Sequence, residues 1–443
     1  MLSIAELPKY ESYKDSGYEW LGKVPESWGL LANKHIFKIK KNLVGKRSAE
    51  YDLLSLTLKG VIKRDMENPE GKFPAEFDTY QEVKPGDFVF CLFDVEETPR
   101  AVGLSPFDGM ITGAYTVLEA DPGFDSQFLY YFYLNLDGKK RLKPLYRGLR
   151  NTIPKESLLS FKTFVPTFEQ QQDIARFLDK KTTQIDEAIA IKEQQIALLK
   201  ERKQIIIQKA VTQGLDPTVP MKDSGVDWIG EIPAHWDIKK LRYLGVTQNG
   251  ISAGAEYFGE GSPFVSYGDV YKNRQLPELV AGLAKSTDSD QKIYSVMDGD
   301  VFFTRTSETV DEIGFASICF RDIEKATFAG FLIRFRPRTD LLIKEFSKYY
   351  FNAELLRKYF VKEMNLVIRA SLSQELLKNL SVVLPPVSEQ LEIYKYLEKK
   401  LHQIDDAISI QILQIEKLKE YKTTLINSAV TGKIRITPDM VEA

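Results

Sequence analysis

The residues of this sequence best suited to chemistry are basic side chains gathered around an aromatic ring. Residues 139–152 contain six lysine and arginine side chains and one tyrosine, interrupted by a proline and a glycine. A basic loop of this kind can contact the phosphate groups of a nucleic acid. A merely solvated basic surface is the alternative. The candidate residues are Lys139, Lys140, Arg141, Lys143, Tyr146, Arg147 and Arg150.

A second basic set lies in the second half of the chain. Residues 332–338 read as a strand carrying three arginines, and residues 301–307 read as a strand that runs into a polar loop. Arg369 follows Arg150 by 219 residues, the interval that also separates other matching stretches. We expect this recurring pair to contact phosphate rather than bases, because it recurs although the two halves otherwise differ. The candidates of this set are Arg305, Thr306, Arg336, Arg338, Arg357, Lys358 and Arg369.

No stretch of the sequence gathers the residues that catalysis would need. There is no Gly-x-x-x-x-Gly-Lys-Ser/Thr phosphate loop and no Asn-Pro-Pro-Tyr type methylation motif. The three histidines, His35, His235 and His402, lack the spacing of metal ligands. Cys91 and Cys319 fit buried thiols in a reducing compartment. We therefore expect a non-catalytic chain with no metal site and no cofactor of its own.

The elements that must hold the basic residues occur twice. Residues 14–28 and 222–236, here called the leading segments, share Lys-Asp-Ser-Gly, two tryptophans, a glycine and a proline at an interval of 208 residues. All four tryptophans of the chain lie in these segments. Gln184–Ile189 matches Gln403–Ile408 at an interval of 219. An internal repeat of this kind predicts one fold present twice, with insertions in the second copy.

Composition sets limits on what these two halves can be. A chain of 443 residues is long enough for two hydrophobic cores. Its net charge of −2 means that any nucleic-acid surface must concentrate basic groups on one face. No apolar run approaches the ~18 residues of a membrane span. We expect a cytoplasmic protein with no membrane partner.

Two long helices are predicted by runs without proline or glycine. The first run extends from Glu169 to Val211, and the second from Ser388 to Val430. Apolar residues at intervals of 4, 7, 3 and 7 form one stripe, which needs a partner helix. The seam residues are Ile185, Ile189, Ile196, Leu199, Ile206, Ile404, Ile408, Ile415, Leu418 and Leu425. We expect an antiparallel coiled coil, with Gly432 near Asp15, where the chain ends would meet.

These observations predict an α+β protein. Two similar modules of mixed sheets and short helices would be related by a pseudo-two-fold and joined by the two long helices. The expected segments are residues 1–165 for the first module, 166–214 for the first long helix, 215–384 for the second module, and 385–443 for the second long helix and the tail.

The leading segments, the closing helices and the hexapeptide Pro385–Gln390 together resemble the specificity (S) subunit of type I restriction-modification enzymes. The resemblance covers the whole chain. It implies two target-recognition domains, each reading one part of an asymmetric bipartite target in double-stranded DNA. It also implies partners: two modification (methyltransferase) subunits that dock on the helices and bring S-adenosylmethionine, and restriction subunits that bring ATP and Mg.

Three other functions are compatible with parts of this pattern. One is the specificity subunit of a related bipartite-site system of the type IIB or IIG kind, which the same motifs would fit. A second is a coiled-coil adaptor that binds no DNA, which would explain the small net charge but not the basic groups ahead of both helices. An enzyme in its own right is the third, and the missing motifs oppose it.

Overall fold

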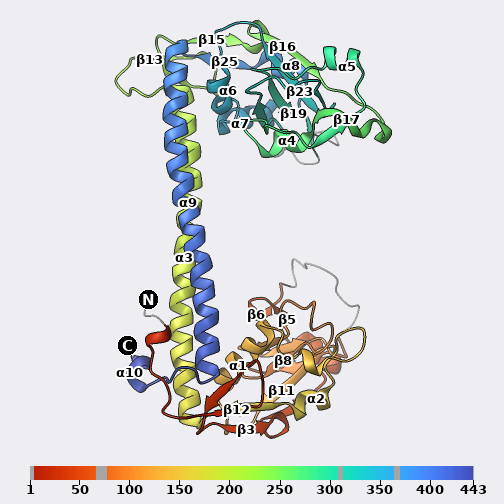
Figure 1. Cartoon of the computed structure of the whole chain (residues 1–443), viewed down its shortest axis with the longest axis vertical. Coiled ribbons are helices and arrows are strands. Elements are labelled where there is room, and N and C mark those ends of the chain that lie inside the picture. The colour runs from red at the N-terminus through yellow and green to blue at the C-terminus, as the bar shows by residue number, and fades with distance from the viewer. Residues whose placement is uncertain (1–3, 66–76, 308–312, 364–369, 443) are drawn as a thin grey trace. The chain divides into compact units, whose positions relative to one another are not determined.

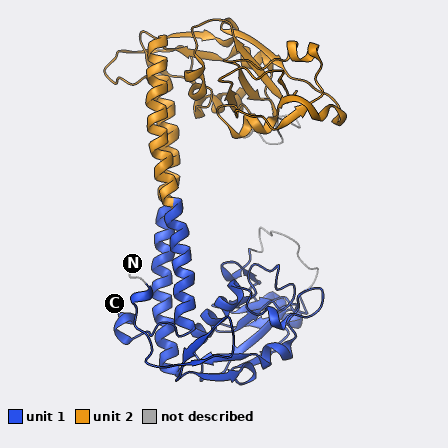
Figure 2. Cartoon of the chain, viewed as in Figure 1, with its two compact units in different colours: residues 1–192, 412–443 blue, residues 193–411 orange. Residues whose placement is uncertain are grey.

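The computed structural model describes residues 4–65, 77–307, 313–363 and 370–442. The chain divides into two compact units, one of residues 1–192 and 412–443 and one of residues 193–411 (Figure 2). Each unit contains an α+β module and parts of the two long helices, α3 (Phe168–Gln213) and α9 (Val387–Val430) (Figure 1). The predicted α+β class, with two similar modules and two long helices that pack together, is confirmed.

The first module is built on an antiparallel four-stranded sheet. In the order β4-β11-β8-β9, the strands are Phe37–Lys40, Thr116–Ala120, Phe88–Phe90 and Val102–Leu104. Helix α1 (Ser126–Gly138) begins where the Asp125 carboxylate accepts a hydrogen bond from the Phe128 N–H at 2.8 Å. The buried Tyr133 ring of α1 meets the Phe90 ring of the sheet edge-on, with centroids 5.4 Å apart. These aromatic contacts join α1 to the sheet.

Shorter elements complete the first module. They are the hairpin β5 (Leu54–Thr57) with β6 (Gly60–Lys63), the pair β7 (Gln81–Val83) with β10 (Gly109–Ile111), helix α2 (Lys155–Ser160), and short 3-10 helices at Ile4–Glu6, Asn33–His35, Gly45–Glu50 and Lys143–Leu145. The leading segment forms a small hairpin, β1 (Tyr13–Asp15) with β2 (Lys23–Pro25). Strand β3 (Gly29–Ala32) pairs with β12 (Lys162–Val165), which closes the module just before α3.

The second module repeats the first around a sheet of the same connectivity. In the order β16-β23-β19-β21, its strands are Gly245–Asn249, Leu332–Pro337, Val301–Thr304 and Ala316–Ile318. The hairpin β13 (Met221–Asp223) with β14 (Glu231–Pro233) again forms the leading segment. Strand β15 (Asp237–Lys240) pairs with β25 (Ser381–Leu384) ahead of α9, as β3 pairs with β12 ahead of α3. The repeat read from the sequence is therefore a repeat of topology.

The two modules differ in what surrounds the sheet. The second module has β17 (Phe258–Val265), β18 (Gly282–Ala284), β22 (Thr327–Phe328), β20 (Thr306–Ser307) with β24 (Ala370–Ser371), and helices α4 (Tyr267–Lys272), α5 (Asp288–Ile293), α6 (Lys344–Tyr350), α7 (Glu354–Glu363) and α8 (Gln374–Asn379). Short turns lie at Leu241–Tyr243, between β15 and β16, and at Ala255–Tyr257, before β17. Helix α10 (Pro438–Glu442) belongs to the first unit. A common frame thus carries unlike peripheral elements.

A buried glutamine locks the start of each long helix to its module. In the first unit the Gln171 side chain donates to the Pro166 carbonyl at 3.0 Å and accepts from the Asp125 N–H at 2.9 Å. Gln390 does the same in the second unit, with the Pro385 carbonyl at 2.8 Å and the Ile343 N–H at 3.0 Å. These bonds satisfy backbone groups that burial would otherwise leave unpaired, which explains the proline-to-glutamine spacing in both halves.

Charged side chains fix the register of the helix pair inside each unit. In the first unit Lys422 donates to Asp186 at 2.6 Å, and Lys192 to Gln414. From the first pair to the second, the residue number increases along α3 (186 to 192) and decreases along α9 (422 to 414). The two helices are therefore antiparallel. In the second unit Lys203 binds Asp405 at 2.6 Å.

The apolar seam residues lie at different depths along this pair. Buried members are Ile185, Ile189, Ile404, Ile415, Leu418 and Leu425; half-buried members are Ile196, Leu199, Ile206 and Ile408. No helix in the described part of the chain is both long enough and apolar enough to cross a bilayer.

Both long helices end on a left-handed glycine that packs on a tryptophan. Gly432 has φ +70°, and a Cβ built there would lie 2.3 Å from Pro25 and 3.3 Å from Trp28. Gly214, with φ +77°, faces Trp236 at 3.2 Å in the same way. The Arg435 N–H also donates to the Pro8 carbonyl at 2.7 Å. The prediction that the chain ends meet near the first leading segment is confirmed.

Gly432→Ala is expected to lower the unfolding free energy of the first unit by about 2 kcal/mol or more. A left-handed backbone costs a non-glycine residue ~1–2 kcal/mol, and the close approach to Pro25 adds steric strain. Gly17→Ala is the matched control, because Gly17 has φ +74° in the same unit but nothing within 4 Å of the new Cβ. Chemical denaturation of both variants measures the difference. Equal losses would show that the packing against Pro25 contributes nothing.

Candidate nucleic-acid interface

The basic loop of the first module, residues 139–152, follows α1. One of its own lysines, Lys140, hydrogen-bonds it to the rest of the module. Lys140 has a left-handed backbone with φ 48°. Its ammonium donates to the Val95 and Thr98 carbonyls at 2.9 and 2.7 Å and to Asp137 at 3.2 Å. Because all three donors are engaged, Lys140 holds the loop against residues 95–98 and does not present its charge to a ligand.

Arg141 also has a structural role. Its guanidinium lies over the Trp20 ring at 4.6 Å and donates to the Asn427 side-chain oxygen at 3.0 Å. Burial lowers the pKa of Arg141. The residue joins the leading segment, the basic loop and the end of α9 within the first unit.

The remaining basic residues of this loop are exposed, and two of them form ion pairs. Lys143 binds Glu96 at 2.6 Å, and Arg150 holds Asp94 through two hydrogen bonds, one of them at 3.0 Å. Arg150 lowers the pKa of the Asp94 carboxyl through these hydrogen bonds. Arg147 donates only to nearby backbone carbonyls. Exposed ion pairs contribute little to stability, so a phosphate could displace these carboxylates.

Tyr146 and Lys139 complete the first candidate set. Lys139 is exposed at the end of α1. Tyr146 is half-buried, and its hydroxyl has no hydrogen-bond partner among the described residues. Burial, followed by the Glu96 charge, raises the pKa of Tyr146 to about 12. The ring packs into the module and is not a free stacking surface.

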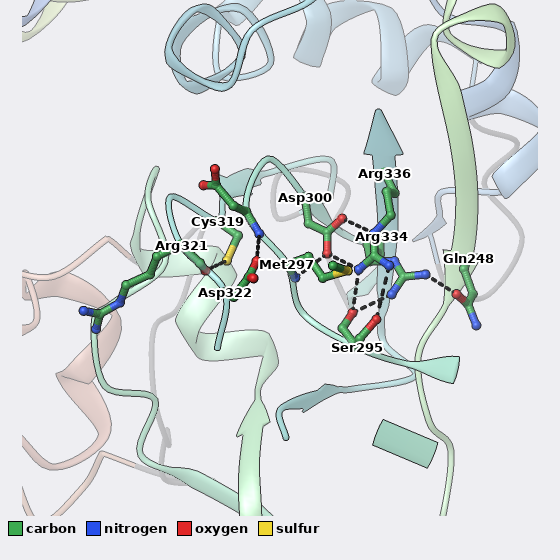
Figure 3. Close-up of polar contacts among 10 residues, drawn as sticks. Gln248, Ser295, Met297, Asp300, Cys319, Arg321, Asp322, Arg334 and Arg336 are labelled. Carbon is green, nitrogen blue, oxygen red and sulfur yellow. Dashed lines mark hydrogen bonds and ion pairs between the residues drawn. The ribbon is translucent and has the colours of Figure 1, made fainter. Parts of the chain in front are cut away.

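In the second module Arg336 forms an ion pair with a fully buried aspartate. Its guanidinium donates from Nε and from a terminal nitrogen to the two Asp300 oxygens, at 2.7 and 2.6 Å (Figure 3). Asp300 also accepts the Met297 N–H at 2.8 Å, which closes the turn before β19. In the first module Asp87 likewise accepts a backbone N–H at 2.7 Å and binds Lys40 at 2.6 Å. The buried aspartate with its cation is thus part of the common frame.

Arg334 lies beside Arg336 and is more deeply buried. It donates to the Ser295 carbonyl and to the Gln248 side chain (Figure 3). Burial lowers the pKa of Arg334 to about 10. Strand β23 therefore turns both of its arginines inward, and the exposed Arg338 follows the strand, which ends at Pro337 rather than at residue 338 as the sequence suggested.

The other candidates of the second set occupy varied places. The half-buried Arg305 guanidinium donates to the Gly330 carbonyl at 3.4 Å. Thr306 lies in β20, opposite Ser371 of β24. Arg369 lies outside the described residues.

Helix α7 brings two candidates together. Arg357 places its guanidinium 4.0 Å from the Phe315 ring centre, and Lys358 pairs with Glu354 at 2.9 Å. Arg357 and Lys358 line a cavity of the second unit together with three further cations that were not predicted as candidates: Lys272, Arg274 and Lys362. The recurrence of Glu354, Lys358 and Lys362 at every fourth position marks one helix face, a signal present in the sequence. Nothing in the sequence places Arg274 with them.

Groups suited to metal or thiol chemistry do not gather in the described parts of the chain. Among those residues, no cluster of three or more His, Cys, Asp or Glu side chains could hold a metal ion. Cys91 and Cys319 are free and buried. Burial raises the pKa of Cys91, and that of Cys319 to about 12, which keeps both as protonated thiols.

Comparison with protein families and curated proteins gives consistent matches. A family profile described as "Type I restriction modification DNA specificity domain" matches residues 236–418. The EcoKI type I restriction enzyme specificity subunit of Escherichia coli K12 is 24% identical over 438 residues, covering 93% of this chain and 90% of that protein.

Two solved structures share the fold over nearly the whole chain. A chain from a type I R-M system, studied for complex assembly and conformational transition, has a TM-score of 0.68 at 15% identity and covers 92% of this chain and 98% of its own. The HsdS subunit from Thermoanaerobacter tengcongensis has a TM-score of 0.54 at 15% identity, covering 95% and 99%. The family profile and the EcoKI match, together with this shared fold, do not favour a coiled-coil adaptor without DNA.

Proposed function

The chain belongs to the family of type I restriction-modification DNA specificity subunits, and we propose that each of its modules reads one part of an asymmetric bipartite target in double-stranded DNA. The observation that carries this proposal is that the two modules share one sheet topology but differ in the helices and strands around the sheet. Both modules use the same strand order, while α4, α5 and α7 belong to the second alone. Similar frames with different peripheral elements suit two readers of different sequences.

The exposed cations are the groups that would meet the DNA backbone. In the first module these are Lys139, Lys143, Arg147 and Arg150, and in the second they include Arg338 and Lys358. Lys140, Arg141 and Arg336 are engaged inside the protein and would act only by holding the modules in shape. Phosphate contacts would fix register on the duplex, while neighbouring polar groups read base edges.

The catalytic steps would belong to partner subunits. We place two modification subunits on the long helices; they would bring S-adenosylmethionine, and restriction subunits would bring ATP and Mg. Exposed apolar side chains along α3 support a protein partner there: Ile191, Leu198 and Ile205 are 55%, 63% and 47% exposed and recur every seven residues. The chain alone would neither methylate nor cut DNA. The proposed setting is the cytoplasm.

Exchanging residues 237–384 for the matching block of another specificity subunit is expected to change one part of the target and leave the other unchanged. The strands β15 and β25 that bound this block belong to the common frame, so the exchange should keep the fold. The measurement is binding of the assembled methyltransferase to single-base variants of its site. The reciprocal exchange of residues 29–165 is the control and should alter the other part. A block exchange that altered both parts would refute the division of reading between modules.

A further inference from the structure

The second unit contains a cavity from which the proposed function has so far used only Lys358. It has a volume of about 750 Å³ and lies between α4, α7, the first residue of β21 and Gln204 of α3. All its lining residues belong to the second unit. Sites for small molecules typically occupy ~300–1,000 Å³, so the space suits a ligand rather than a single water.

The lining of this cavity is strongly cationic. It contains five basic side chains against one carboxylate, that of Glu354, which is already paired with Lys358. The chain as a whole carries a net charge of −2, so this concentration is local. The basic lining residues are Lys272, Arg274, Arg357, Lys358 and Lys362.

No described residue compensates the charge of Arg274 by direct contact. Its side chain is half-buried, and its guanidinium has no hydrogen bond and no ion pair with any described residue. Burial lowers the pKa of Arg274, which means that its charge is poorly solvated. Asp405 acts on it only through space and is itself held by Lys203 at 2.6 Å. A partly desolvated cation without a partner is unfavourable until an anion arrives.

Two aromatic rings, Phe315 and Tyr271, also line the cavity. The Arg357 guanidinium lies 4.0 Å from the Phe315 ring centre, and Tyr271 meets that ring edge-on at 4.9 Å. Stacking on Phe315 restrains the Arg357 fork in one orientation. The cavity therefore contains two guanidinium groups, and a guanidinium matches the geometry of phosphate oxygens.

We propose that this cavity is a phosphate-binding site, with Arg274 as its principal ligand and Arg357, Lys272 and Lys362 in support. The phosphate could come from the DNA backbone or from a free nucleotide, and both present the same anionic oxygens. Only the DNA source rests on the proposed function; a nucleotide site would stand without it.

The test is Arg274→Gln in the full chain, titrated with pyrophosphate and, separately, with adenosine triphosphate by calorimetry. We expect the wild-type chain to bind and the variant to lose at least about tenfold in affinity, the ratio that a charge-assisted hydrogen bond supports. Arg242→Gln is the matched control, because Arg242 is an exposed arginine of the same unit outside the cavity. The control should bind as the wild type does.

Thermal unfolding without ligand separates a ligand-binding role from a structural one. Removing an uncompensated half-buried charge should leave the melting temperature unchanged or raise it, whereas removing a structural arginine should lower it. A marked loss of stability in Arg274→Gln, not seen in Arg242→Gln, would overturn the assignment.

The source of the phosphate is determined by measuring how tightly the assembled methyltransferase binds its cognate duplex at several salt concentrations. If the phosphate belongs to DNA, Arg274→Gln should reduce the slope of log binding constant against log salt concentration by the amount that corresponds to about one phosphate contact. An unchanged slope with lost nucleotide binding identifies a free nucleotide. Equal phosphate binding and equal slopes in variant and wild type would refute the site and leave the proposed function intact. Failure of the wild-type assembly to prefer its cognate duplex would refute the proposed function instead, and the phosphate titrations would still decide the cavity.

Discussion

Asp300→Ala is expected to lower the unfolding free energy of the second unit by about 3–5 kcal/mol. The substitution leaves the partly buried Arg336 guanidinium without its carboxylate and the Met297 N–H without its acceptor. It also opens a small void at a site whose side chain is fully buried. Denaturant unfolding, followed by a probe in the second unit, measures the change.

Asp298→Ala is the control for that experiment. Asp298 lies two residues earlier and binds Lys344 at 2.6 Å, but its side chain is 46% exposed. Exposed ion pairs stabilise proteins by ~0–1 kcal/mol, so this variant should unfold almost as the wild type does. If both aspartates proved equally dispensable, burial of the Asp300–Arg336 pair would have no energetic importance.

Leu418→Asp should destabilise the helix pair of the first unit by about 3 kcal/mol or more. Leu418 is 6% exposed in the seam, so the new carboxylate would lose most of its hydration there and would replace apolar contacts between the helices. Leu413→Asp makes the same chemical change on the same helix at a residue 55% exposed. That control should cost less than about 1 kcal/mol. Thermal unfolding of the two variants compares them, and indistinguishable melting temperatures would contradict the seam.

The long helices and the repeated modules were predictable because the sequence patterns that indicate them are local or occur twice. A run without proline or glycine predicted a helix over residues 169–211, and α3 extends only slightly further, from Phe168 to Gln213. The run from Gln127 to Leu136, rich in Tyr and Phe, likewise reads as a short helix from sequence; α1 spans Ser126–Gly138, and Asp125 caps its start. Leading segments 208 residues apart form equivalent hairpins. Each of these signals depends on neighbours in sequence or on the repeat.

The basic surface was much less predictable, because the partner of a cation is distant in sequence. Arg150 binds a carboxylate 56 residues away, and Arg336 binds one 36 residues away. A charge pattern read along the chain cannot distinguish these engaged side chains from exposed Arg338. Arg274 stands in no basic run, and only the packing of α4 and α7 places it in a cationic cavity.

The discontinuous make-up of the first unit has a consequence for how the chain is synthesised. Its final residues, 412–443, supply the end of α9, the glycine that packs on Trp28 and the bond from Arg435 to Pro8. A ribosome has therefore made every residue of the contiguous second unit before the first unit can close. Domains usually complete in order from the N-terminus. Here the first unit is completed only after the second, and the site around Trp28 stays uncovered until residues 412–443 have been made.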